Sequence, residues 1–465
     1  MALSLITDMY RGLSLLFFCI ALLAVLDKLG KGLVLRESIV LFYSFTCLLM
    51  PLIGYKYYSR DNHLAFIFGK VMAVPEVTYF SFVLPAIAAF AVAICWPLPQ
   101  KSQIDDNGPK LFEAVDDIKN SETDIKQLGL KIMVGGIMLF LLFKILPAGL
   151  RFVGVLFFFS TFAGFLYVYY SPASVSRLTI LLVFSLFIFG NALASGMFTI
   201  VAYMGITLFS YFFLGNKVSL LKKASIFIVA ILFFLVLQNT KGTYRQYTWH
   251  SNYKGNKAAL FIRLYIDNLK TGEGLFDRDE FFPVYTRTNQ GLNISLVQKR
   301  IPARQQFDNG DRLLKVLAAS IVPRVFWPDK PEAGGKFNML HYAGIRISGF
   351  STNVGPLGEG WGSFGRDGGI VFMFVLGWFI RLAYLTMFNA SRKAPFLIFW
   401  IPVVFYQLTY SAETDTLQIL NSIFKGGFFI WLFMKVKPDW FGQLRGGSQR
   451  LKRYETVSNF PEAGQ

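Results

Sequence analysis

The chain of 465 residues is too apolar for a water-soluble globular protein, since 54% of its residues are hydrophobic, 17% are aromatic and its mean hydropathy is +0.47. Its formal net charge of +18 does not indicate nucleic acid, because basic residues of membrane proteins set orientation or bind anionic lipid head groups. Cys19, Cys47 and Cys95 all lie inside apolar runs, which excludes a disulfide framework and a cysteine metal cluster. Composition therefore predicts an integral membrane protein without a nucleic-acid partner.

About eleven apolar segments, within a range of 10 to 12, have the length that a membrane-spanning helix needs. Roughly 17 to 25 apolar residues cross a bilayer core of about 30 Å. The segments are residues 12–26, 38–55, 77–96, 128–146, 152–170, 178–194, 197–214, 224–238, 370–388, 395–411 and 417–434. Charged residues rather than a cleavage site follow the first segment, so we expect it to be retained. Residues 63–76 are apolar but short, and they are either re-entrant or a twelfth segment.

Basic residues are unevenly divided between the two sides of the predicted bundle. With the carboxyl tail in the cytoplasm, the short cytoplasmic segments hold 19 Lys and Arg, against five in the short segments opposite. Cytoplasmic loops normally carry this excess. We therefore predict an all-α polytopic membrane protein. Its parts are a bundle over 1–238 with an acidic cytoplasmic loop at 99–127, a large loop at 239–369 on the exported side, helices over 370–434 and a basic cytoplasmic tail at 435–465.

The predicted exported loop is itself basic, with 18 Lys and Arg against 11 Asp and Glu. A phosphate-bearing ligand would explain this excess, because arginine forks bind phosphate oxygens bidentately and lysine supplies a point charge. A solvated loop balanced by its own salt bridges explains the charge equally well. The candidate ligand-binding residues of this loop are Arg287, Arg300, Arg304, Arg312, Arg324, Lys330 and Trp327.

Residues 311–332 of this loop predict a helix that lies in the membrane interface. Apolar side chains recur at helical spacing before a Trp327-Pro328 turn. Arg324 and Lys330 then come at the height of lipid head groups, where a lipid-linked pyrophosphate would also lie. Ordinary snorkelling of the two side chains towards water is the alternative.

A glycine-rich stretch at 351–369 leads directly into a predicted membrane helix. Its seven glycines indicate tight turns or a close approach of the backbone to another group. No strand precedes it, so a dinucleotide-binding loop is excluded. Glu359 is a lone carboxylate among these glycines and is our candidate for a general base. The other interpretation is a structural partner for a nearby arginine.

Three further side chains are candidates for the acid or base. Glu413 and Asp415 lie in the short turn between the last two predicted helices, where helix capping is the alternative interpretation. His341 lies in the large loop, and neither it nor His250 has ligand residues at zinc spacing.

A metal site is not expected. Asp277 and Asp279 form a DxD pattern, but a two-residue pattern arises often by chance, and we expect a surface turn there. The sequence therefore predicts neither a metal nor a cofactor.

Two loop segments resemble the Wzy-type oligosaccharide repeat-unit polymerases, also called O-antigen polymerases. The resemblance covers about the final third of the chain and is strongest in IVPRVFWPDKPE and STNVGPLGEGWGSFGRDGG. Trp361 stands where the family often has Tyr. The matching positions are Pro323, Arg324, Trp327, Pro328, Lys330, Pro331, Thr352, Glu359, Phe364, Gly365 and Gly368.

The resemblance implies a GT-C-like membrane glycosyltransferase of polysaccharide and lipopolysaccharide biosynthesis in the bacterial inner (cytoplasmic) membrane, with residues 239–369 as a large periplasmic loop. Its donor would be an undecaprenyl pyrophosphate-linked oligosaccharide and its acceptor a second lipid-linked repeat unit, with membrane lipids and a chain-length regulator as further partners. Arginines would stabilise the leaving pyrophosphate without a metal, with Arg324 and Glu359 as the catalytic pair and with inversion at the anomeric carbon. An O-antigen ligase and a flippase or transporter of the lipid-linked oligosaccharide remain the alternatives.

Overall fold

The computed structural model describes residues 2–97, 115–116, 124–145, 151–195, 199–214, 218–251, 253–270, 278–322, 324, 326–348 and 351–442. Within these ranges the chain is helical and contains no β-strand. Most of the expected loop at 99–127, most of the tail at 435–465 and Asp277 lie outside the described residues.

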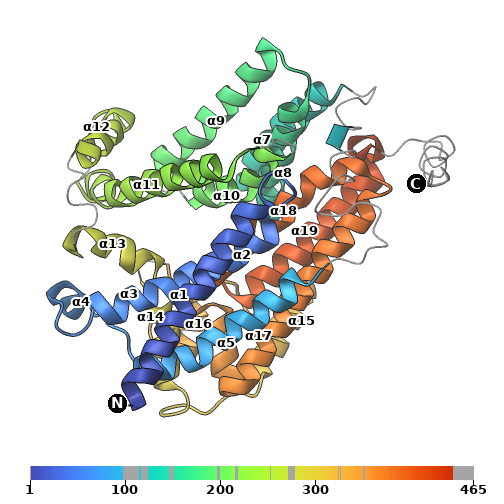
Figure 1. The fold of residues 1–465 in the computed structure, drawn as a ribbon. Coiled ribbons are helices and arrows are strands. Elements are labelled where there is room, and N and C mark those ends of the chain that lie inside the picture. The colour runs from blue at the N-terminus through green and yellow to red at the C-terminus, as the bar shows by residue number, and fades with distance from the viewer. Residues whose placement is uncertain are drawn as a thin grey trace, which may run out of the picture.

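Long apolar helices make up the body of the molecule (Figure 1). Ten of those in the described ranges are long and apolar enough to cross a membrane, which confirms the predicted class of all-α multi-pass membrane protein. The expected segment 197–214 forms only the 15-residue helix α10, shorter than the length that a bilayer core requires. The helices of the bundle are α1 (Ala2–Lys28), α2 (Leu35–Ser44) with its continuation α3 (Met50–Tyr57), α5 (Glu76–Cys95), α7 (Ile125–Ile145), α8 (Arg151–Tyr170), α9 (Val175–Ser195), the shorter α10 (Thr199–Phe213), α11 (Leu220–Arg245), α17 (Gly355–Ser391), α18 (Ile401–Thr409) with the preceding 3-10 helix η6 (Pro395–Trp400), and α19 (Thr416–Val436).

Shorter helices gather at one end of this bundle. Residues 63–76 belong to them, because they form a five-residue helix and a loop that are too short for a twelfth membrane crossing. The helices are α4 (His63–Ile67), α12 (Lys257–Lys270), α13 (Arg278–Thr288), α14 (Gly291–Arg300), α15 (Asp311–Ile321), α16 (Gly335–Asn338) and the π-helical turn η5 (Met339–Ala343).

Contacts between distant segments define the two ends of the bundle. We call the end that carries the shorter helices the loop end. There, Arg11 pairs with Glu76 at 2.8 Å, and the Tyr285 hydroxyl donates to the Lys70 carbonyl at 3.0 Å. At the opposite end, which we call the tail end, Arg381 donates to the carbonyl of Trp96 at 3.0 Å. The described parts of 56–75 and 278–354 therefore lie at the same end.

Part of the large loop packs into the bundle instead of standing apart from it. The backbone N–H of Gln290 donates to the carbonyl of Thr46 at 3.1 Å. A side chain on Gly291 would meet Pro51 and Tyr79 at 2.5 and 2.6 Å, so only glycine lets α14 approach this closely. Leu292 is buried in the main core. The start of α14 is thus packed against α3 and α5.

The glycines of α17 serve two purposes. Gly365 has φ +72° and ψ −155°, which breaks α17 into two helical pieces in a conformation that glycine adopts readily. Further along, a side chain on Gly377 would meet the Phe90 carbonyl at 2.7 Å. The turn at Gly365 is therefore of the kind that the glycine-rich stretch 351–369 predicts, while Gly377, beyond that stretch, lets α17 pack closely against α5.

Candidate functional site

Glu359 lies in the first piece of α17 and faces the protein interior. Its side chain is only 1% exposed. Asn338 donates to Oε1 at 2.6 Å, and Thr416 donates to Oε2 through its amide at 2.9 Å and also through its hydroxyl. Both carboxylate oxygens are therefore satisfied within the protein.

Asp415 caps the start of α19, as the capping alternative from the sequence predicts. Its carboxylate accepts from the Gln418 amide at 2.7 Å, from the side chain of Asn353 at 3.1 Å and from the Gly334 amide. Burial raises the pKa of Asp415, although these donors oppose the rise. This side chain is 1% exposed.

Two asparagines join these carboxylates into one unit. Asn338 Nδ2 also reaches Asn353 Oδ1 at 3.4 Å, and the Arg312 guanidinium donates to Asn338 Oδ1 at 3.0 and 3.3 Å. Arg312 thereby brings a positive charge next to the two buried carboxyl groups. We call this unit the carboxylate network; it consists of Arg312, Asn338, Asn353, Glu359, Asp415 and Thr416.

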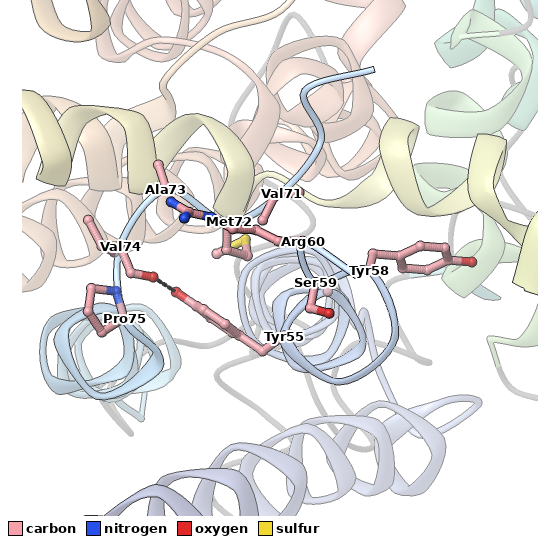
Figure 2. A pocket seen from close by; sticks show the side chains of 10 residues that line it. Tyr55, Tyr58, Ser59, Arg60, Val71, Met72, Ala73, Val74 and Pro75 are labelled. Carbon is pink, nitrogen blue, oxygen red and sulfur yellow. Dashed lines mark hydrogen bonds between the residues drawn. The ribbon is translucent and has the colours of Figure 1, made fainter. Parts of the chain in front are cut away.

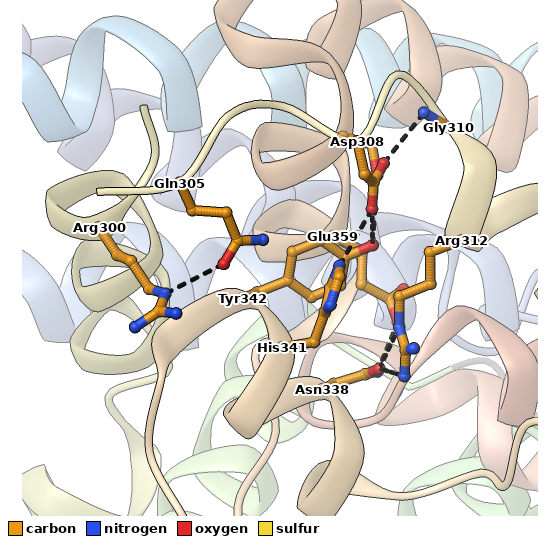
Figure 3. Close-up of polar contacts among 10 residues, drawn as sticks. Arg300, Gln305, Asp308, Gly310, Arg312, Asn338, His341, Tyr342 and Glu359 are labelled. Atoms are coloured by element: carbon orange, nitrogen blue, oxygen red, sulfur yellow. Dashed lines mark hydrogen bonds and ion pairs between the residues drawn. The ribbon is translucent and has the colours of Figure 1, made fainter. Parts of the chain in front are cut away.

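A second polar group, the His341 site, lies beside the first, as Figure 3 shows. His341 Nε2 is 3.3 Å from Asp308 Oδ2, and the Tyr342 hydroxyl donates to the same oxygen at 3.2 Å. The Gly310 amide donates to Asp308 Oδ1 at 3.0 Å, and the Tyr342 hydroxyl lies 3.2 Å from Ser363 Oγ. Asp308 therefore fixes the imidazole of a residue on η5.

Exposure separates His341 from the other acid or base candidates. Its side chain is 35% exposed. Partial burial alone would raise the pKa of Asp308, but hydrogen bonds from His341, Ser363, Gly310 and Tyr342 outweigh it and lower the pKa. His341 thus combines an ionised orienting partner with access to solvent.

Arginines flank this histidine. Arg300 Nε donates to Gln305 Oε1 at 3.2 Å, and its guanidinium lies against Gly344, whose φ is +73°. In Figure 3, His341 lies between Arg300 and Arg312. Arg304 is exposed in the turn that follows α14. Arg300, Arg304 and Arg312, three of the predicted phosphate-binding residues, thus lie near one another.

Arg324, Lys330 and Trp327 belong to a different place, the carboxyl end of α15. Lys330 Nζ donates to the carbonyls of Ala319 and Val322 at 2.8 and 2.6 Å. Burial, helped by nearby Arg324, lowers the pKa of Lys330. Arg324 pairs with Glu332 at 3.4 Å, and Trp327 packs in the cluster between α15 and α19. Lys330 therefore stabilises a helix end.

Arg287 and Glu413 form an ion pair elsewhere at the loop end. The Arg287 Nη2 to Glu413 Oε2 distance is 2.8 Å, and the side chains are 39% and 9% exposed. Glu413 thus has an arginine as its structural partner. The structure does not bring this pair to the His341 site.

A pocket of about 290 Å³ opens at the loop end between α3 and the segment before α5 (Figure 2). The Tyr55 hydroxyl donates to the Val74 carbonyl across it at 2.9 Å, and Arg60 contributes a cation. None of the candidate catalytic or ligand-binding residues from the sequence lines this pocket.

In the described ranges, no three His, Cys, Asp or Glu side chains gather in a way that could hold a metal ion. Asp279 of the DxD pattern is exposed at the start of α13. His250 ends a π-helical turn after α11.

Sequence reasoning missed several residues of these groups, which are Asp308, Asn338, Tyr342, Asn353, Ser363 and Thr416. Asp308 precedes a turn in which Asn309 and Gly310 have φ of +52° and +87°, and an Asp-Asn-Gly run does signal a turn. Nothing in that signal indicates a histidine 33 residues later in the chain.

Comparison with known proteins identifies one family but no individual curated protein or solved structure. A family match extends over residues 111–389, a region that includes Asp308, His341 and Glu359 but ends before Asp415. Because the match covers more than half of the 465 residues, the chain belongs to the family described as a domain of unknown function (DUF8712).

Proposed function

We propose that the chain is a bacterial inner-membrane polysaccharide polymerase, a GT-C-like glycosyltransferase. It transfers an undecaprenyl pyrophosphate-linked oligosaccharide onto a lipid-linked acceptor repeat unit. The single observation that carries the proposal is the contact of 3.3 Å between His341 and Asp308 at the loop end, with arginines on either side. The resemblance of the two loop segments to Wzy-type polymerases supports the choice of substrate.

His341 is the general base in this proposal. An imidazole hydrogen-bonded to a carboxylate is a standard acid or base group near neutral pH. Asp308 accepts the Nε2 proton, so the lone pair on Nδ1 is available to an acceptor hydroxyl. Glu359 and Asp415 are 1% exposed and fully hydrogen-bonded, so we assign them to positioning instead.

Arg300, Arg304 and Arg312 bind the pyrophosphate of the donor. Guanidinium groups bind phosphate oxygens bidentately and retain their charge at all working pH values. Charge develops on the leaving pyrophosphate as the glycosidic bond breaks, and fixed cations stabilise that charge. A metal is not needed in this scheme.

The chemical step is a single displacement. The acceptor hydroxyl oxygen forms a bond to the anomeric carbon of the donor sugar, while the bond from that carbon to the phosphate oxygen breaks. The pyrophosphate leaves with the bonding electrons, and Nδ1 of His341 takes the hydroxyl proton. The anomeric configuration inverts, and undecaprenyl pyrophosphate is released.

The loop end faces the periplasm in this proposal. The excess of Lys and Arg on the short segments of the tail side supports that orientation. Lipid-linked repeat units in the outer leaflet would then present their pyrophosphate to the loop end from the membrane.

The test is chain growth by the purified protein in lipid nanodiscs supplied with lipid-linked repeat units. A ladder of products several repeat units long is expected, together with free undecaprenyl pyrophosphate. A flippase would yield no new glycosidic bond in this single compartment. A ligase would act only after a lipid A-core acceptor is added, and either result would refute the polymerase.

A further inference from the structure

One side of α12 packs firmly against the spanning helices. Phe261 is buried, with its ring centroid 6.2 Å from that of Phe189 on α9 and 5.5 Å from that of Tyr244 on α11. Asn268 donates to the Thr240 hydroxyl at 2.9 Å. α12 is therefore fixed beside the loop end of α11.

Another side of α12 is apolar but lacks a covering element in the described part of the chain. Ile262, Ile266 and Leu269 are 55%, 42% and 57% exposed. Their spacing of four and three residues puts them in one row along the helix. Rows of exposed large apolar side chains mark a surface that another apolar phase covers.

The neighbouring helices indicate that lipid covers this row. Leu182 and Leu186 of α9 and Val229 of α11 are exposed large apolar side chains on helices long and apolar enough to span a membrane. Such surfaces face acyl chains. Tyr265 of α12 packs against Phe233 of α11 with a centroid distance of 5.7 Å, so the row on α12 continues a surface that lipid already covers.

The charges around this row favour anionic lipid. Residues 253–270 hold four exposed cations and one acid, Asp267. Arg263 and Lys270 lie on the same side of α12, about a quarter turn from the apolar row. The other two cations are Lys254 and Lys257.

We propose that α12 is a lipid-binding helix in the interface of the leaflet at the loop end, selective for anionic phospholipids. The apolar row lies among the upper acyl chains, and Arg263 and Lys270 bind lipid phosphates. Basic side chains on an amphipathic helix attract anionic head groups in this way. This surface is separate from the His341 site and does not depend on the proposed reaction.

The test measures lipid contact with an environment-sensitive fluorophore at Ile266→Cys in a cysteine-free full-length chain. The protein is placed in nanodiscs that contain acyl-chain spin-labelled phosphatidylcholine or, at the same content, spin-labelled phosphatidylglycerol. We expect quenching by both lipids, and about twofold stronger quenching by phosphatidylglycerol because the anionic lipid is enriched at the helix. In the Arg263→Gln, Lys270→Gln double variant the two lipids should quench equally.

A matched control places the same fluorophore at Leu182→Cys of α9, a lipid-facing position on another helix. There both lipids should quench equally, in the native background and in the double variant, which also reports that the variant is folded. Equal quenching by the two lipids at position 266 would overturn the selectivity. An absence of quenching would show that protein covers the row, and selectivity that survives the double variant would exclude the two cations as its cause.

Discussion

Asn338 donates a hydrogen bond of 2.6 Å to Glu359, and Asn338 immediately precedes the helical turn that carries His341. The buried carboxylate of α17 thereby holds the segment that presents the imidazole. Glu359 acts on the His341 site through Asn338, so we regard it as a positioning residue.

Replacing Glu359 by Gln should destabilise the protein. The new amide group has to face either the Thr416 donors or the Asn338 donor, so at least one buried donor loses its acceptor. We expect a loss of about 1–3 kcal/mol in the free energy of unfolding. The check is the thermal unfolding midpoint of the detergent-solubilised protein, with exposed Glu332→Gln as the matched control. An unchanged midpoint would show that the network does not support α16.

His341→Ala should remove the proposed general base and lower the rate of chain growth by about 10²- to 10⁴-fold. Asp308→Asn should give a smaller loss, because the imidazole remains but its orienting carboxylate is gone. The measurement is the initial rate of polymer formation in nanodiscs, normalised to folded protein. His63→Ala changes the exposed histidine of α4 at the same end and should retain the native rate. Native rates for His341→Ala would eliminate the proposed base.

The lowered pKa of Asp308 predicts a pH dependence of stability. A carboxyl whose pKa is lower in the folded state stabilises the fold above its unfolded pKa of about 4, and that contribution disappears as the pH falls through the folded pKa. Asp308→Asn should therefore lower the unfolding midpoint at neutral pH, and the difference from the native protein should shrink below about pH 4. A difference that grows on acidification would contradict the direction of the shift.

Lys330→Met tests whether this lysine stabilises a helix end or binds phosphate. Loss of its bonds to the Ala319 and Val322 carbonyls should cost about 1–3 kcal/mol of stability, while the KM for the lipid-linked donor stays unchanged. Lys315→Met, which changes an exposed lysine of α15, is the control. A large rise in KM without loss of stability would show that Lys330 binds phosphate instead.

Gly344→Ala should disturb the His341 site through Arg300. The added Cβ would lie 1.9 Å from Arg300 Nη1, at a backbone φ of +73°. Gly69→Ala isolates the backbone cost of about 1–2 kcal/mol, because Gly69 has φ +60° and open space around it. We expect both variants to lose stability, but only Gly344→Ala to raise the KM for donor. Equal KM values in the two variants would show that Arg300 does not contribute to donor binding.

The fold class was predictable because a bilayer imposes long apolar helices, and their hydropathy is visible in the sequence. Hydropathy does not reveal how a polar loop segment packs. Residues around α14 are mostly polar in sequence, yet Asn289 and Gln290 are buried and Gly291 lies against Pro51. The close approach that permits this depends on partners more than 200 residues away in the chain.

The candidate site was predictable only in part. Pattern and resemblance pointed to Glu359, Arg324 and Lys330, yet the bonding of Lys330 is to helix carbonyls, which spacing alone could not indicate. Asp308 has no periodic or motif signal that links it to His341, because the pairing arises from the path of the chain between α14 and η5. Exposure, which separates His341 from the buried carboxylates, is a property of the fold.

Arg36 and Arg381 both donate to the carbonyl of Trp96, at 3.2 and 3.0 Å. Arg381 is synthesised 285 residues after Trp96, so the first membrane hairpins must wait in the bilayer, with this junction incomplete, until most of the chain has left the ribosome. A chain that stops before Arg381 should therefore be a substrate for membrane quality-control proteases, even though its early helices are already inserted.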